Sequence, residues 1–253
     1  MTVSCATDLL DLLGARHGLV CLVGAGGKRS TQFQLARRFS GRLGLANTAH
    51  AKLFPPDWAE FSVVTGETLV ADVIARRASP RLLFAHPSPT PGRLAGVSLE
   101  ELAAIRDAVP FDLLLVKADG ARTRLLKVPA AHEPVLPEDV DTVIHLSAAT
   151  ALGEPLDDRI AHRPGRVADV CGLAEGQRVE PVHLARLLAS PQGALKDVGD
   201  ARVVPVINMV DDAGRHRLAR AAATEALRLT ERYDYVVLAS MSRNEPVVDV
   251  VTR

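Results

Sequence analysis

A five-residue apolar run near the N-terminus, followed at once by glycines and a lysine, limits the fold more than any other feature. Residues 19–23 are all apolar, and Gly24-Ala25-Gly26-Gly27-Lys28 follow directly. A short apolar run that ends in glycines is typical of a buried parallel strand. From about Ser30 the apolar residues recur at helical spacing instead. The sequence therefore predicts a strand, a glycine-rich loop and a helix in succession.

More apolar runs alternate with helical patterns along the rest of the chain. Strands are expected at 43–48, 81–85, 113–118, 142–147, 203–208 and 235–240, with a weaker candidate at 61–65, and helices at 67–78, 98–108, 182–189 and 214–232. Such alternation produces right-handed βαβ units and a mostly parallel sheet. We expect a three-layer α/β/α protein that forms a single domain over residues 1–253. Two segments with weak periodicity, 122–136 and 153–166, are predicted to be long loops over the C-terminal edge of the sheet.

The composition argues against several classes of function. Lys plus Arg and Asp plus Glu both number 30, so the net charge is zero, whereas nonspecific nucleic-acid binders usually carry a basic excess. The three cysteines show no Cys-x-x-Cys spacing, which makes a disulfide framework unexpected. There is no signal-peptide pattern at the N-terminus and no apolar run of about 18 residues. We therefore expect a cytoplasmic protein that binds neither nucleic acid nor a membrane.

The glycine loop, residues 24–28, has the composition of a phosphate-binding loop. Glycines let the backbone approach an anion closely, and the helix that follows supplies N–H groups and a positive dipole end. Lys28 can place a charge on the β- and γ-phosphates of a nucleotide. The residues expected around a bound nucleotide are Gly24, Ala25, Gly26, Gly27, Lys28, Arg29, Ser30 and Thr31. The alternative is a tight strand–helix turn that binds nothing.

The match to known glycine motifs is partial. The P-loop pattern Gly-x-x-x-x-Gly-Lys-Ser/Thr meets Leu22 at its first glycine position and Arg29 where it needs a hydroxyl residue. The dinucleotide fingerprint Gly-x-Gly-x-x-Gly fails at its third glycine, which is again Arg29. Ser30 and Thr31 follow one and two places late, so either can substitute for the missing hydroxyl, and Ser30 is the candidate ligand for Mg²⁺.

Polar residues follow two further strands at the edge where a ligand is expected. Thr48 and His50 come after the second strand, and Asp119 follows the apolar run 113–118. A carboxylate in that position can hold Mg²⁺ directly or through water. We expect catalytic roles for Lys28 and Asp119, with Mg²⁺ at Asp119 and Ser30. The alternatives are an ordinary polar loop at 48–50 and an Asp-Gly turn at Asp119.

The segment 206–211 ends a strand with a pattern similar to the base-reading motif Asn-Lys-x-Asp of GTPases, with Met209 at the lysine position. In that motif the aspartate accepts two hydrogen bonds from the edge of guanine, and the asparagine contacts the base. Asn208 and Asp211 are therefore candidates to bind the base of GTP or ATP, with support from Ser240 at the next strand end. The alternative is a polar strand end with a helix cap from Asp211 or Asp212.

Charged residues and histidines in the two long loops are candidates for a rim around an anionic cofactor or a second phosphate. They are Arg122, Arg124, Lys127, His132, Glu133, His162 and Arg163. The alternative is a solvated loop, and nothing in the spacing of the histidines requires a metal. Cys21 is expected in the core and Cys171 on a helix.

Five stretches carry a resemblance to a known family. They are Val23-Gly24-Ala25-Gly26-Gly27-Lys28; Thr48-Ala49-His50 through Pro55-Pro56; Ala118-Asp119-Gly120-Ala121 with Leu126 through Val135; His162-Arg163-Pro164; and Asn208-Met209-Val210-Asp211. In this order they resemble the YqeC proteins, predicted accessory factors for selenium-dependent molybdenum hydroxylases. The resemblance implies a P-loop NTPase-like fold and a role in maturing a molybdenum- or selenium-bearing cofactor. It also implies molybdenum hydroxylases or cofactor-biosynthesis proteins as partners.

The chain departs from that family pattern at the predicted nucleotide site. Arg29-Ser30 stands where the family usually has two threonines, and Lys117 stands where it usually has a glutamate. These changes favour binding without turnover, whereas Lys28 and Asp119 favour catalysis. Two functions therefore stay open. One is a Mg²⁺-dependent NTPase or a nucleotidyl or phosphoryl transferase, and the other is a non-hydrolysing, degenerate P-loop domain that acts as a cofactor- or partner-binding chaperone.

Overall fold

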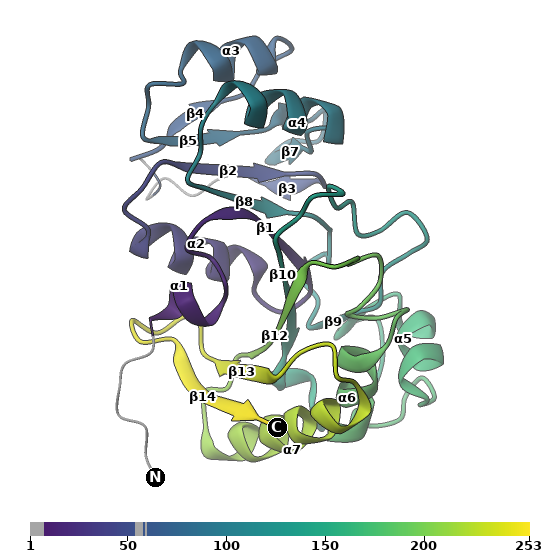
Figure 1. Ribbon diagram of the computed structural model, residues 1–253. Helices are drawn as coiled ribbons and strands as arrows, with labels where there is room; N and C mark the ends of the chain where they lie inside the picture. The colour runs from purple at the N-terminus through teal and green to yellow at the C-terminus, as the bar shows by residue number, and fades with distance from the viewer. Residues whose placement is uncertain (1–7, 54–57, 59) are drawn as a thin grey trace.

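The computed structural model describes residues 8–53, 58 and 60–253. A nine-stranded sheet lies at its centre. The strands are β1 (Gly18–Gly24), β2 (Leu43–Asn47), β4 (Ser62–Val64), β5 (Arg81–Phe84), β8 (Leu113–Lys117), β10 (Thr142–Ala148), β12 (Arg202–Asn208), β13 (Tyr235–Ala239) and β14 (Val247–Thr252). Their order is β14-β13-β12-β10-β1-β8-β2-β5-β4, and all neighbouring pairs are parallel except β13 and β14 (Figure 1). The predicted mostly parallel sheet is confirmed.

Helices cover both faces of this sheet. One face packs against α1 (Leu9–Leu12) and α2 (Lys28–Arg38). The other packs against α3 (Leu69–Ala75), α4 (Leu99–Ala108), α5 (Pro164–Cys171), α6 (Pro181–Ala189) and α7 (Ala213–Leu229), with a 3-10 turn, η2 (Ala149–Ala151), after β10. Because side chains alternate along a strand, Cys21 of β1 faces the hydrophobic core under α3 to α7, and Leu22 faces the core under α1 and α2. The three-layer α/β/α prediction is thus confirmed.

The connections that follow β1 and β8 run in opposite directions across the strand order of the sheet. After β1 the chain passes through α2 to β2, on the far side of β8, whereas after β8 it continues to β10, on the far side of β1. Diverging connections of this kind leave a crevice at the C-terminal edge of a parallel sheet, where ligands bind. In the dinucleotide-binding fold the first two strands in chain order are neighbours, but here β8 separates β1 from β2. The place where this rule puts a ligand therefore lies beside the glycine loop and Asp119.

Several short elements and one full strand differ from the sequence expectation. The two predicted long loops contain β9 (Leu126–Lys127) and β11 (Ala161–His162), which pair in parallel, and the second loop also contains the start of α5. A small second sheet joins β3 (Ala51–Lys52), β7 (Arg93–Ala95) and β6 (His86–Pro87). Strands of two residues are too short to show periodicity. β14 was also missed, although its partner β13 was predicted.

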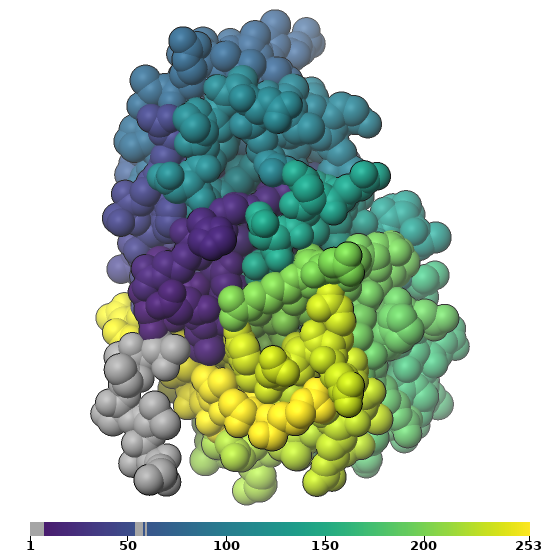
Figure 2. All heavy atoms as spheres, viewed as in Figure 1, coloured from purple at the N-terminus to yellow at the C-terminus, as the bar shows by residue number. Residues whose placement is uncertain are grey.

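The N-terminal and C-terminal parts of the described chain contact each other at the edge of the sheet where the parallel strands begin. The Tyr235 hydroxyl donates a hydrogen bond to the Leu12 carbonyl at 2.6 Å, and Arg202 donates to the Tyr235 oxygen at 2.6 Å. In Figure 2 the purple N-terminal segment and the yellow C-terminal segment share one face of the molecule. Among the described residues, no helix has both the length and the apolar character needed to cross a membrane.

Candidate functional site

The glycine loop has a backbone that other residues rarely adopt. Gly24, Gly26 and Gly27 have φ values of 87°, 78° and 127°. The loop also packs tightly, because a Cβ atom on Gly26 would lie 2.6 Å from the Cβ of Ala148, and one on Gly27 would lie 2.2 Å from Nδ2 of Asn208. Left-handed backbone and close packing both require glycine here. The loop is therefore held against the ends of β10 and β12, and α2 begins at Lys28 without a side-chain cap.

Lys28 is buried at the start of α2 and forms an ion pair with Asp119. Its side chain is 6% exposed, and Nζ lies 2.8 Å from Oδ1 of Asp119. The same ammonium group also donates to the carbonyl of Gly24. Burial lowers the pKa of Lys28, and the charge of Asp119 opposes that change. The lysine that was expected to contact phosphate is thus paired with the carboxylate of Asp119, which lies beside the glycine loop.

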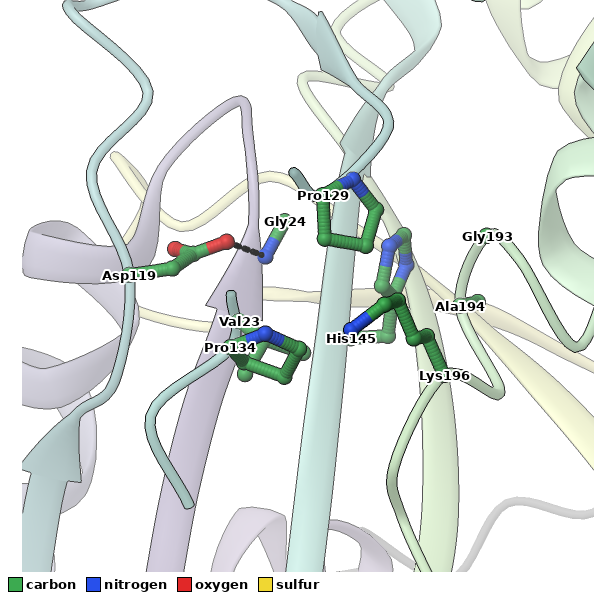
Figure 3. A pocket seen from close by; sticks show the side chains of 9 residues that line it. All are labelled: Val23, Gly24, Asp119, Pro129, Pro134, His145, Gly193, Ala194 and Lys196. Carbon is green, nitrogen blue, oxygen red and sulfur yellow. Dashed lines mark hydrogen bonds between the residues drawn. The ribbon is translucent and has the colours of Figure 1, made fainter. Parts of the chain in front are cut away.

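Asp119, in the segment that follows β8, is a centre of hydrogen bonding. Its Oδ2 accepts from the backbone N–H of Gly24 at 3.0 Å and lies 2.9 Å from Nζ of Lys127. Figure 3 shows the Asp119 carboxylate directed at the Gly24 nitrogen. Burial alone would raise the pKa of Asp119, but the charges of Lys28 and Lys127 outweigh burial and lower it. Asp119 is therefore a buried, ionised carboxylate that lies beside Gly24, the last residue of β1.

The ionic cluster continues through Lys127 to Glu133 and Arg163. Lys127 Nζ lies 3.0 Å from Glu133 Oε1, and Arg163 lies 2.6 Å from Glu133 Oε2. Burial would raise the pKa of Glu133, but hydrogen bonds from the Ala130 N–H and from Lys127 outweigh it and bring the pKa to about 2. The cluster links the glycine loop to the long segment 118–136 and to the start of α5.

The residues after Lys28 have separate positions. Arg29 is half-buried and donates to the carbonyl of Leu53, and Ser30 is exposed. Thr31 is buried, and its hydroxyl donates to the carbonyl of Gly27 at 3.1 Å. Ala25 is also buried, and its N–H donates to the carbonyl of Leu146 at 2.8 Å. Only the Ser30 hydroxyl of this set faces solvent.

These residues do not fit a magnesium ion in the conformation described. Both oxygens of Asp119 lie within 3 Å of lysine ammonium groups. Within the described part of the chain, no group of three or more His, Cys, Asp or Glu side chains is arranged to hold a metal. Magnesium prefers carboxylate and phosphate oxygens and keeps several waters. The predicted use of Asp119 and Ser30 as Mg²⁺ ligands therefore requires a rearrangement around Asp119.

The polar residues after β2 contact the segments beside the glycine loop. The Thr48 hydroxyl donates to the carbonyl of Val135 at 2.9 Å, which joins the end of β2 to the segment 118–136. Lys117, at the end of β8, donates to the carbonyl of His50 at 3.1 Å. Burial, followed by the charge of Lys28, lowers the pKa of Lys117 to about 7. The His50 side chain is exposed.

Asn208 and Asp211 are close in sequence but differ in environment. The Asn208 side chain is buried; Nδ2 donates to the Gly26 carbonyl at 2.8 Å and Oδ1 accepts from the Met241 N–H at 2.9 Å. Asp211 is 42% exposed, and its Oδ1 accepts from the Ser240 hydroxyl at 2.6 Å. Asn208 thus anchors the glycine loop, while Asp211 presents a carboxylate at the surface, next to Ser240 as the sequence suggested. The cap of α7 comes from Asp212.

His145 is a site residue that the sequence analysis missed. It lies in β10 beside Val23 and is 2% exposed, and neither ring nitrogen has a hydrogen-bond partner among the described residues. Burial lowers its pKa to about 4, so the ring is neutral at neutral pH. The ring lines a cavity of about 10 Å³ together with Asp119, Pro129, Pro134 and Lys196 (Figure 3). A histidine in mid-strand gives no sequence signal that separates it from other buried polar residues.

The residues predicted to form a basic rim differ in their exposure to solvent. Arg122 and His132 are exposed, and Arg124, His162, Arg163 and Glu133 are half-buried. Lys127 is fully buried, so its prediction as part of a rim around an anionic cofactor was wrong. Tertiary packing of β9 against β11 encloses Lys127, and no local pattern indicates that packing.

Together, the fold and the site define the class of protein. It is a three-layer α/β protein with a glycine loop and a buried Lys–Asp pair at the C-terminal edge of a mainly parallel sheet. Residues 20–165 match the family described as YqeC protein. A protein of Escherichia coli (strain K12) with the name Uncharacterized protein YqeC is 32% identical over 191 residues, which cover 74% of each chain. The chain belongs to the YqeC family, as its sequence stretches predicted.

Proposed function

We propose that this chain binds a nucleoside triphosphate through its glycine loop and acts as an accessory protein in the maturation of molybdenum- or selenium-dependent hydroxylases. The observation that carries the first part is Lys28, buried at the start of α2 behind three glycines of positive φ. A helix N-terminus with an adjacent lysine is a common anion site. The role in hydroxylase maturation comes from the family resemblance and would involve hydroxylase or cofactor-biosynthesis proteins as partners.

Binding would proceed by exchange of one anion for another. A phosphate oxygen would replace the Asp119 oxygen that lies 2.8 Å from Lys28. Asp119 would keep the Gly24 N–H and Lys127 on its other oxygen. The exchange therefore leaves neither Lys28 nor Asp119 as an unpaired buried charge, which would be costly.

The base would lie near Asp211. This carboxylate is partly exposed and held by Ser240, so it can accept hydrogen bonds from two neighbouring N–H groups. Guanine presents such a pair of donors, and for that reason we expect GTP to bind more tightly than ATP. Asn208 would act through the glycine loop, because both ends of its amide are already bonded to backbone groups.

The site favours binding with little turnover over rapid hydrolysis. Both Asp119 oxygens contact ammonium groups, and Lys117, whose pKa is lowered to about 7, adds a third amine that is partly charged at neutral pH. Hydrolysis or phosphoryl transfer assisted by Mg²⁺ is the second candidate function, and the pair Lys28 and Asp119 is the observation that supports it. Phosphate release measured in the binding experiment distinguishes the two.

The test is a titration of the full chain with GTP, ATP and CTP, with and without Mg²⁺, followed by calorimetry and by phosphate release. Lys28→Met removes the ammonium group but leaves Asp119 paired with Lys127. Loss of a charge-assisted contact to phosphate is expected to weaken binding by about 10- to 100-fold. Arg37→Met, an exposed residue near the other end of α2, is the matched control and should bind like the wild type. Absence of nucleotide binding above background in the wild type would refute the proposal.

A further inference from the structure

Lys127 occupies a closed cage of oxygen atoms. It lies in β9, and its side chain has 0% exposure. Its ammonium group lies 2.9 Å from Asp119 Oδ2, 2.6 Å from the Gly120 carbonyl and 3.0 Å from Glu133 Oε1. An ammonium group has three N–H donors, so three acceptors satisfy it completely. Lys127 is thus a fully coordinated internal cation.

The cage is itself fixed from outside. Glu133 receives hydrogen bonds from the Ala130 N–H at 3.1 Å and from Arg163 at 2.6 Å. Gly120 contributes a backbone carbonyl, which cannot rotate away as a side chain can. Lys127 therefore stays in place even when Lys28 changes its partner. Among the residues that the structure describes, Lys28, in contrast, has only Asp119 and the Gly24 carbonyl as partners.

Lys127 lies at one of the two Asp119 oxygens that a divalent ion would have to contact. A cation at that oxygen would lie next to the Lys127 ammonium group, and a cation at the other oxygen would lie next to Lys28. When Lys28 moves to a phosphate, the Lys127 ammonium group stays beside Asp119 and continues to repel a second cation there. Like charges at such distances repel strongly in a buried site. The residues present thus disagree with the magnesium site that the glycine loop and Asp119 led us to expect.

We propose that Lys127 is a built-in cation that takes the place of a divalent metal ion at Asp119, so that nucleotide phosphate binds to the glycine loop without a divalent metal. Lys127 is a positioning residue: it holds Asp119 ionised against the Gly24 N–H while Lys28 passes to the phosphate. The inference rests on the proposed nucleotide binding. Its metal part, however, concerns Asp119 alone and is tested without any nucleotide.

The experiment has two arms on the full chain. In the first, Mn²⁺ alone is titrated and free Mn²⁺ is measured by electron paramagnetic resonance. The wild type is expected to bind no Mn²⁺ up to about 1 mM, whereas Lys127→Met, which uncovers one Asp119 oxygen, should bind at least about tenfold more tightly. In the second arm, GTP affinity is measured in EDTA and in Mg²⁺. It should change by less than about threefold in the wild type and by more than about tenfold in Lys127→Met. Lys52→Met, an exposed lysine of β3, is the control and should behave like the wild type in both arms.

Three results would overturn the inference. They are Mn²⁺ binding by the wild type that Asp119→Asn abolishes, a wild-type GTP affinity that rises about tenfold or more with Mg²⁺, and a folded Lys127→Met that gains no metal dependence. If Lys127→Met does not fold, the wild-type measurements and Asp119→Asn still decide. Absence of GTP binding in all variants would refute the proposed function, while the Mn²⁺ arm would still decide whether Lys127 excludes a metal from Asp119.

Discussion

The anchoring of the glycine loop by Asn208 leads to the sharpest stability prediction. Asn208→Ala removes a donor to the Gly26 carbonyl and an acceptor for the Met241 N–H, at 2.8 and 2.9 Å. Asn208 is 3% exposed, so water cannot readily replace either bond. The mutation therefore leaves two backbone groups without partners inside the protein.

The magnitude follows from those two groups. Each buried backbone group that is left without a partner costs about 1–3 kcal/mol, so the two groups together should cost about 2–6 kcal/mol of unfolding free energy. Asp211→Asn is the matched comparison, because Asp211 is 42% exposed and an asparagine oxygen can still accept from the buried Ser240 hydroxyl. That variant should lose less than about 1 kcal/mol but should bind guanine nucleotides more weakly.

Urea denaturation followed by far-ultraviolet circular dichroism measures both changes. Asn208→Ala should lower the midpoint without a change in slope, since the native and unfolded surfaces stay the same. A loss below about 0.5 kcal/mol in Asn208→Ala would refute the assignment of Asn208 as the loop anchor. A large loss in Asp211→Asn would show that the two residues do not divide these roles.

Two further predictions concern the ionic cluster and the loop. The pKa of Glu133, about 2, lies below its usual 4.5, so its ionised form stabilises the fold above about pH 4.5, and that stabilisation disappears as the pH falls toward 2. After allowance for solvent screening, Glu133→Gln should therefore be less stable than the wild type near pH 7 by about 1–2 kcal/mol, and this difference should shrink in acid. A stability difference that does not change with pH in urea titrations would contradict this prediction. Gly26→Ala forces a Cβ to 2.6 Å from Ala148 at a φ of 78° and should cost more than about 2 kcal/mol, so an unchanged denaturation midpoint would contradict the loop packing.

The sheet was largely predictable because its central strands are buried on both faces. Such strands contain continuous apolar runs, and the strand predicted at 113–118, which begins with four apolar residues, corresponds to β8 at Leu113–Lys117. The edge strand β14 was missed because most of its residues are only half-buried and an aspartate interrupts its valines. Short pairs such as β9 with β11 depend on contacts between distant segments, which periodicity does not report.

The placement of the candidate site residues was predictable where it depends on strand ends and not where it depends on burial. Lys28 and Asp119 follow neighbouring parallel strands, so the rule that ligand residues gather at one sheet edge brings them together correctly. The same rule does not predict that the Lys127 side chain is buried, or that the Asn208 amide forms its hydrogen bonds with backbone groups. Those outcomes depend on which donors and acceptors meet after the segment 118–136 has folded over the sheet.

Under the proposed nucleotide binding, this arrangement would also restrict the ligands that the loop can accept. Asp119 places a negative charge where the loop and Lys28 can hold one, and removing it without replacement would leave a buried ammonium group unpaired. An unpaired buried charge costs several kcal/mol, so only an incoming anion can release Lys28. A neutral nucleoside cannot provide that exchange, however well its base fits beside Asp211. Affinity at this site should therefore depend on phosphate first and on the base second.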